Sequence, residues 1–190
     1  ALGKSLMLLL FAKTKSMNFC KTWKTRPEIL LMVMAAAMPI AFWAWVVLLN
    51  NFTVEVASFT GKEIGILQSL REVPGFLSFL VVYLLLIIAE QRLALLSLFI
   101  LGVGVALTGY FPTIIGLYIT TVISSIGFHY YEACHQSLSL QWLDKKTAPE
   151  RMGLIYSVAS VAKFLVLGAI FTVYLLSLPE ISWQALASST

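Results

Sequence analysis

Five apolar stretches, each long enough to cross a lipid bilayer, constrain the fold of this chain more than any other feature. They cover residues 29–50, 64–89, 93–110, 113–142 and 153–178. A helix needs about 20 apolar residues to span a bilayer. Charged residues make up 12% of the chain, against about 25% in soluble domains, so lipid must contact most of the surface. The sequence therefore predicts an all-α membrane protein with about five transmembrane helices.

Basic residues predict how these helices are oriented. Residues 1–28 carry six Lys or Arg side chains, the turn at 90–92 carries one and the turn at 143–152 carries three. The connections on the opposite side carry only Lys62. Because loops rich in Lys and Arg stay in the cytoplasm, we expect a basic cytoplasmic tail and a multi-pass location in the cell (inner or plasma) membrane. Residues 179–190 are too short to span and are interpreted as the start of a truncated sixth helix.

Several residues within the spans bear on how the helices bend and pack. Pro39 and the pair Pro74-Gly75 should distort the first and second spans, because proline cannot donate a backbone hydrogen bond. Trp43 and Trp45 are interpreted as anchors at the membrane interface, with the lining of a cavity as the less common alternative. The third span contains glycines that allow a neighbouring helix to approach closely: Gly102, Gly104 and Gly109.

Charged residues inside the second span form the first candidate site. Gln68, Arg71 and Glu72 recur at helical spacing on one face. A charge at the centre of a bilayer costs about 2.5–3.5 kcal/mol on insertion scales, so each one needs a partner, a cavity or a function. Two interpretations remain open for Arg71 and Glu72. They either form a local pair with Gln68 in a helix contact, or they contact a substrate or a gate.

The fourth and fifth spans predict a symmetric helical hairpin around Thr147-Ala148. Asp144 and Arg151 are equidistant from this midpoint, and so are Glu132 and Lys163. In an antiparallel helix pair, residues equidistant from the turn lie at the same depth, so we expect Glu132 and Lys163 to form an ion pair inside the membrane. The pair either locks two helices together, which we favour, or forms a site that couples protons or substrate, with Glu132 as the proton carrier.

The fourth span also carries a polar stripe, which should face protein or water rather than lipid. Its members are Ser125, His129, Glu132, Gln136 and Ser139. A comparable stripe on the fifth span consists of Tyr156, Ser160 and Lys163. His129 and His135 lie about 120° apart on the helix and Cys134 points elsewhere, so we expect neither a metal site nor a cofactor. No phosphate-binding loop, nucleophile elbow or zinc-protease motif occurs, and nothing indicates an enzyme.

Two segments resemble the major facilitator superfamily of transporters. Residues 142–153, WLDKKTAPERMG, are similar to that family's loop between helices four and five. In that loop of the family an acid ends helix four, as Asp144 would here. A Pro-acid-Arg segment and a glycine then open helix five, as Pro149, Arg151 and Gly153 would here. Residues 59–67, FTGKEIGIL, look like the start of helix two. The turn at 90–92 retains an acid and a base of the family's loop between helices two and three, but lacks its glycine and basic run.

The resemblance covers residues 29–178, as helices one to five of an N-terminal six-helix bundle. It implies secondary transport of a small solute by alternating access, often coupled to H⁺, in which a C-terminal half missing from this chain would be a partner. The alternative is a non-transporting membrane module, a sensor or an assembly subunit, whose intramembrane charges are structural. Either way the partners include the lipid bilayer and exclude nucleic acid, since the basic residues concentrate at segment ends. The candidate pathway residues are Glu132, Lys163, His129, Gln136, Arg71, Glu72, Gln68 and Tyr156.

Overall fold

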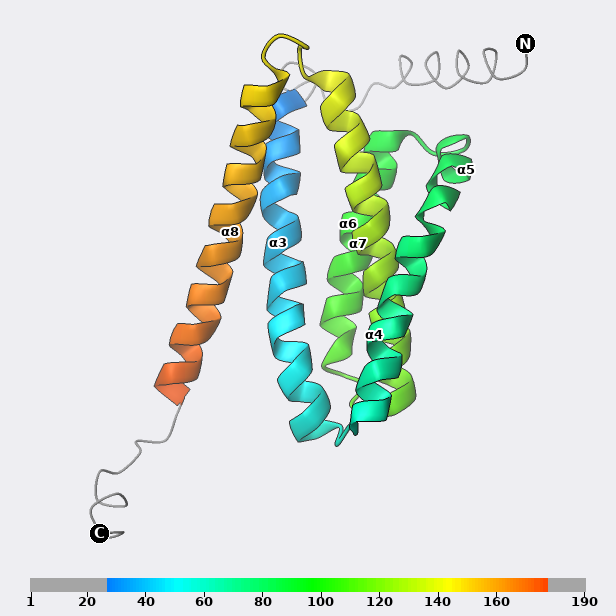
Figure 1. The fold of residues 1–190 in the computed structure, drawn as a ribbon, viewed down its shortest axis with the longest axis vertical. Coiled ribbons are helices and arrows are strands. Elements are labelled where there is room, and N and C mark those ends of the chain that lie inside the picture. The colour runs from blue at the N-terminus through cyan, green and yellow to red at the C-terminus, as the bar shows by residue number, and fades with distance from the viewer. Residues whose placement is uncertain (1–26, 178–190) are drawn as a thin grey trace.

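The computed structural model describes residues 27–177 and shows an all-α protein (Figure 1). Five helical segments in this range are long and apolar enough to cross a membrane, which confirms the predicted number of spans. They are Pro27–Val56, Gly61–Leu85, Glu90–Thr108, Ile114–Trp142 and Ala148–Leu175. The predicted basic tail lies almost wholly outside the described residues, and the predicted start of a sixth helix lies entirely outside them.

The first span combines α3 (Pro27–Asn51) with a π-helical turn, η1 (Phe52–Val56). The helix continues through Pro39, which is buried, so the distortion expected there does not end it. After η1 the chain reverses at Ser58, whose φ of 54° is in the left-handed region. Thr60 then begins the second span with a capping box, in which its backbone N–H donates to Glu63 at 2.9 Å. This box fixes where the second span starts.

The second span consists of three pieces, because the α-helix ends shortly after its proline. The α-helix α4 (Gly61–Phe76) contains Pro74 and passes into a 3₁₀ turn, η2 (Leu77–Leu80), before the short helix α5 (Val81–Leu85). Proline removes one backbone hydrogen bond and crowds the preceding turn. A tightened 3₁₀ segment within a helix marks this kind of local strain. The structure thus agrees with the prediction that Pro74-Gly75 weakens the helix, and it ends the span at Leu85 instead of residue 89.

The helices α6 (Glu90–Thr108) and α7 (Ile114–Trp142) form the most extensive helix contact. Two glycines allow it. A Cβ atom on Gly104 would lie 2.7 Å from the backbone nitrogen of Ser124, and one on Gly127 would lie 2.4 Å from the backbone nitrogen of Leu101. The expectation that Gly102 and Gly109 serve the same purpose is wrong, because no atom of another helix in the described residues lies within 4 Å of either Cβ position.

The last helix, α8 (Ala148–Ser177), packs mainly against α3, whereas α7 packs against α6 and α4 (Figure 1). Near the connecting turn the helices still share one apolar core. There Ile155 of α8 packs with Tyr131 and Leu138 of α7 and with Leu31 of α3. The predicted hairpin therefore exists at its turn but does not continue along the length of α7.

Trp45 occupies the interior of the second apolar core and is 3% exposed. Its indole Nε1 donates a hydrogen bond to the Thr108 hydroxyl at 3.2 Å. The hydroxyl of Thr108 in turn donates to the Gly104 carbonyl at 2.9 Å. The interpretation of Trp45 as an interfacial anchor is wrong. It ties α3 to α6 inside the bundle.

Candidate functional site

Two polar pockets lie along α7, and together they contain most of the predicted pathway residues. The first, which we call the Arg71 pocket, has a volume of about 230 Å³ and lies between α3, α4 and α7. Its lining consists of Phe42, Trp43, Val46, Arg71, Glu72, Phe128 and His129. The predicted residues Arg71, Glu72 and His129, which come from two different helices, are thus brought together.

Close packing between α4 and α7 holds this pocket in shape. Gly75 leaves room for the His129 ring, because a Cβ atom at Gly75 would lie 2.7 Å from the ring's Cε1. One helical turn before His129 on α7, the Ser125 hydroxyl donates to the backbone carbonyl of Arg71. The first part of the predicted polar stripe therefore faces α4, as expected for a stripe that avoids lipid.

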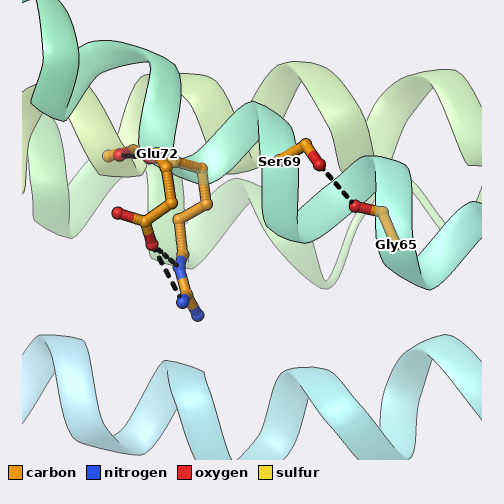
Figure 2. Close-up of polar contacts among 5 residues, drawn as sticks. Gly65, Ser69 and Glu72 are labelled. Carbon is orange, nitrogen blue, oxygen red and sulfur yellow. Dashed lines mark hydrogen bonds and ion pairs between the residues drawn. The ribbon is translucent and has the colours of Figure 1, made fainter.

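Arg71 and Glu72 form an ion pair with each other at the edge of the pocket. Arg71 Nε and Nη2 both donate to Oε1 of Glu72, at 3.1 and 3.0 Å. Figure 2 shows the Glu72 carboxylate extending from α4, while Ser69 donates within α4 to the Gly65 carbonyl. The local pair is therefore real, but the role expected for Gln68 in it is wrong. Gln68 makes no hydrogen bond to either member of the pair and is not among the described residues that line the pocket.

The second pocket, the Glu132 pocket, measures about 140 Å³ and lies between α3, α7 and α8. It unites three predicted residues, Glu132 and Gln136 of α7 and Tyr156 of α8. Ala35, Met38, Tyr131, His135, Ile155 and Ala159 complete the lining. Within the described part of the chain, the Glu132 carboxylate forms neither an ion pair nor a hydrogen bond, and its side chain is exposed to the pocket.

Two residues that the sequence analysis had not assigned to a site form the inner wall of the Glu132 pocket. Tyr131 is 1% exposed, and its buried hydroxyl has no hydrogen-bond partner among the described residues. Its ring stacks on His135 with centroids 5.2 Å apart. Nε2 of His135 lies 3.1 Å from the Leu31 carbonyl oxygen of α3. Tyr131 and His135 are four residues apart and therefore lie on one face of α7, and this spacing next to Glu132 was the signal that could have indicated them.

The predicted ion pair between Glu132 and Lys163 is wrong. Lys163 Nζ lies instead over the ring of Trp43, 3.5 Å from its centroid, in a cation–π contact. Trp43 therefore contacts a charge and lines the Arg71 pocket, so its interpretation as an interfacial anchor is also wrong. The cation–π contact fixes α8 against α3 and keeps Lys163 away from the carboxylate of Glu132.

Helix ends and helix neighbours explain this error. Glu132 lies ten residues before the end of α7 at Trp142, whereas Lys163 lies fifteen residues after the start of α8 at Ala148. At about 1.5 Å per residue, the difference places Lys163 roughly 7.5 Å deeper. Accordingly, Tyr156 and not Lys163 lies at the level of Glu132. Symmetry about the turn predicts depth only when both helices start at equal distances from it.

The turn between α7 and α8 is organised by Asp144. Its backbone carbonyl accepts hydrogen bonds from Thr147 at 3.0 Å and from Ala148 at 2.7 Å. Arg151 does not pair with Asp144, as the symmetric hairpin suggested, but with Glu28 of α3 at 3.5 Å. Of the other predicted turn residues, Pro149 lies in the first turn of α8, and Gly153 lies inside it with no atom near its Cβ position.

Glu90, which the sequence places in the turn at 90–92, is a buried acid. It is the first residue of α6 and is 6% exposed. One carboxylate oxygen accepts a hydrogen bond from Gln141 Nε2 of α7 at 2.7 Å, and the other has no partner in the described residues. The contact joins the start of α6 to the end of α7.

A larger cavity of about 700 Å³ lies between α3 and α8, away from both polar pockets. Its lining is apolar apart from Asn51 and Tyr174 and holds no acid or base. Such a surface suits lipid chains or an apolar segment better than a polar solute. Among residues 27–177, no three His, Cys, Asp or Glu side chains come close enough to hold a metal ion. The candidate site is therefore the pair of polar pockets.

Comparisons of the chain with models of protein families, with curated proteins and with solved structures found no match. The residues and their geometry show a multi-pass, all-α membrane protein in which ionisable side chains line pockets between the helices.

Proposed function

We propose that this chain is part of a secondary transporter, which moves a small solute by alternating access and couples that movement to protons. The observation that carries the proposal is the placement of Arg71, Glu72, His129 and Glu132 around pockets inside membrane-spanning helices. Ionisable residues within a membrane are costly and mark pathways for solutes, ions or protons. The resemblance to the major facilitator superfamily agrees with this function and adds a C-terminal half as the partner and the cell membrane as the location.

Glu132 is the proton carrier in this proposal. A structural role would require a partner for its charge, and the nearest predicted partner, Lys163, is held by Trp43. The carboxylate instead faces a pocket with the side chains of His135 and Gln136. A carboxyl group in such a pocket can bind and release a proton whenever water reaches the pocket from one side of the membrane.

The test is solute uptake by proteoliposomes that contain the full-length protein and an imposed pH gradient. A panel of radiolabelled small solutes identifies what is transported. Glu132→Gln should abolish uptake driven by the gradient, because glutamine keeps the shape of the side chain but cannot carry a proton. Glu150→Gln, which removes an exposed acid from the turn, is the matched control and should transport normally. Undiminished proton-driven uptake by Glu132→Gln would refute the coupling role.

One observation favours the alternative function, a non-transporting module with structural charges. Lys163 on Trp43 and Arg151 with Glu28 both fasten α8 to α3. If the intramembrane charges only lock helices, Lys163→Met should lower thermal stability, whereas Glu132→Gln, whose carboxylate has no partner among the described residues, should leave both stability and activity unchanged. If Glu132 carries protons, Glu132→Gln should abolish proton-driven uptake without lowering thermal stability.

A further inference from the structure

We infer that the Arg71 pocket binds a small zwitterion of the amino-acid type, with a carboxylate, an ammonium group and an apolar side chain. The inference rests on the proposed function and names the class of solute that it would transport. Three features of the pocket support it: the balance of its charges, the unused hydrogen-bonding capacity of its ion pair, and its aromatic walls.

The charge balance favours a ligand that carries both signs. Arg71 and Glu72 neutralise each other within the pocket. A bound anion would take the guanidinium and leave the Glu72 carboxylate without a partner, and a bound cation would leave Arg71 without one. An unpaired charge inside a membrane protein is strongly unfavourable. A zwitterion can replace the internal pair with two new pairs, so no charge is left alone.

The geometry of the ion pair leaves both partners able to bind a ligand. Both hydrogen bonds from Arg71 end on Oε1 of Glu72, and Oε2 accepts none from the described residues. Nη1 of Arg71 is likewise not engaged with the carboxylate. The Arg71 side chain is 29% exposed and that of Glu72 is 63% exposed. A guanidinium in this position can bind a carboxylate through two parallel N–H groups, while the carboxylate of Glu72 accepts from an ammonium group.

Aromatic rings form the rest of the pocket and fit an apolar side chain. Phe42 of α3 stacks on Phe128 of α7 with centroids 4.1 Å apart, and Trp43 lines the pocket beside them. Lys163 contacts the same tryptophan but is not among the residues that line the pocket. The volume of about 230 Å³ is below the roughly 300–1,000 Å³ of pockets for drug-sized ligands. The ligand must therefore be small.

A ligand series on the unaltered protein tests the inference without any mutation. Binding of L-phenylalanine to the purified full-length protein is compared with binding of 2-phenylethylamine, which lacks the carboxylate, and of 3-phenylpropanoate, which lacks the ammonium group. We expect L-phenylalanine to bind at least about tenfold more tightly than either analogue, as the loss of one charge-assisted contact predicts. Equal or tighter binding of either analogue would overturn the inference.

Variants then locate the binding site. Arg71→Gln combined with Glu72→Gln removes both charges together and should abolish the preference for the zwitterion. Lys62→Gln, on the exposed first turn of the same helix, should bind like the unaltered protein. A preference that survives the double variant would overturn the assignment to this pocket.

This experiment separates the inference from the proposed function. Binding of L-phenylalanine with the expected selectivity, but without uptake into proteoliposomes, would support the inference and refute transport. Proton-driven uptake of another class of solute, with no selective binding of L-phenylalanine, would refute the inference and leave the proposed function standing.

Discussion

Gly104 lies where α6 contacts α7, and a methyl group at this position should destabilise the bundle. A Cβ atom there would lie 2.5 Å from the Ser124 hydroxyl oxygen and 2.7 Å from the Ser124 backbone nitrogen. These distances are roughly 1 Å shorter than ordinary contacts between non-bonded atoms. Because a backbone nitrogen cannot rotate aside, the two helices would have to separate. Gly102, two residues earlier in the same helix, has no atom within 4 Å of its Cβ position and provides a matched control.

The two substitutions should change stability in opposite directions. Overpacking a well-packed interior costs about 1–3 kcal/mol, whereas replacing glycine by alanine within a helix stabilises it by about 1 kcal/mol. For Gly104→Ala the overpacking cost should lie in the upper part of its range, because the new methyl group meets backbone atoms. After the gain in helix propensity is subtracted, the net loss in the free energy of unfolding is about 1–2 kcal/mol. For a chain of this size, the apparent Tm should fall by roughly 2–8 °C. Gly102→Ala should raise it by roughly 2–4 °C.

Each purified variant is heated in detergent, and size-exclusion chromatography measures how much of the protein remains monodisperse. The loss of monodisperse protein with temperature gives the apparent Tm. The comparison uses one detergent and one protein concentration throughout. If Gly104→Ala raised the apparent Tm as much as Gly102→Ala does, the close crossing of α6 and α7 at Gly104 would be refuted, and with it the placement of α7 that positions both pockets.

Substitutions test three further contacts by the same thermal assay. Trp45→Phe should lower stability by about 1–3 kcal/mol, because the Thr108 hydroxyl loses a buried donor; an unchanged Tm would contradict its interior position. A double-mutant cycle of Trp43→Leu and Lys163→Met should give a coupling energy of about 0.5–2 kcal/mol, and additive effects would exclude the cation–π contact. Arg151→Gln should cost no more than about 1 kcal/mol, since its ion pair is exposed, and a larger loss would indicate a buried role.

The number and approximate limits of the helices followed from the sequence because spanning a bilayer requires long apolar runs, which hydropathy alone reveals. The break after Pro74 was predictable for the same kind of local reason, since a proline affects its own helix. The polar stripe on α7 was predicted to face protein or water, and the structure confirms the protein side at Ser125, whose hydroxyl donates to α4, while Glu132 is exposed to a pocket.

The neighbours of each helix could not be predicted in this way. Hydropathy indicates that α8 spans the membrane, but it does not indicate that α8 packs on α3. This helix contact decides where Lys163 lies. Tryptophan in an apolar run suits an interface and an interior equally well, so Trp43 was misinterpreted. The burial of Glu90 could not be predicted because its partner, Gln141, is 51 residues away in sequence. Each of these errors concerns a contact between helices rather than a property of one helix.

Water access to the Glu132 pocket tests the central claim most directly. In a variant of the full-length protein in which Cys20, Cys134 and every cysteine outside this chain are replaced by serine, Gln136→Cys places a single thiol in that pocket. A membrane-impermeant thiol reagent is then applied to either side of proteoliposomes that contain the full-length protein. Alternating access predicts labelling from one side, at a rate that changes severalfold when a pH gradient is imposed. Absence of labelling from both sides, or a rate that the gradient does not affect, would contradict the account.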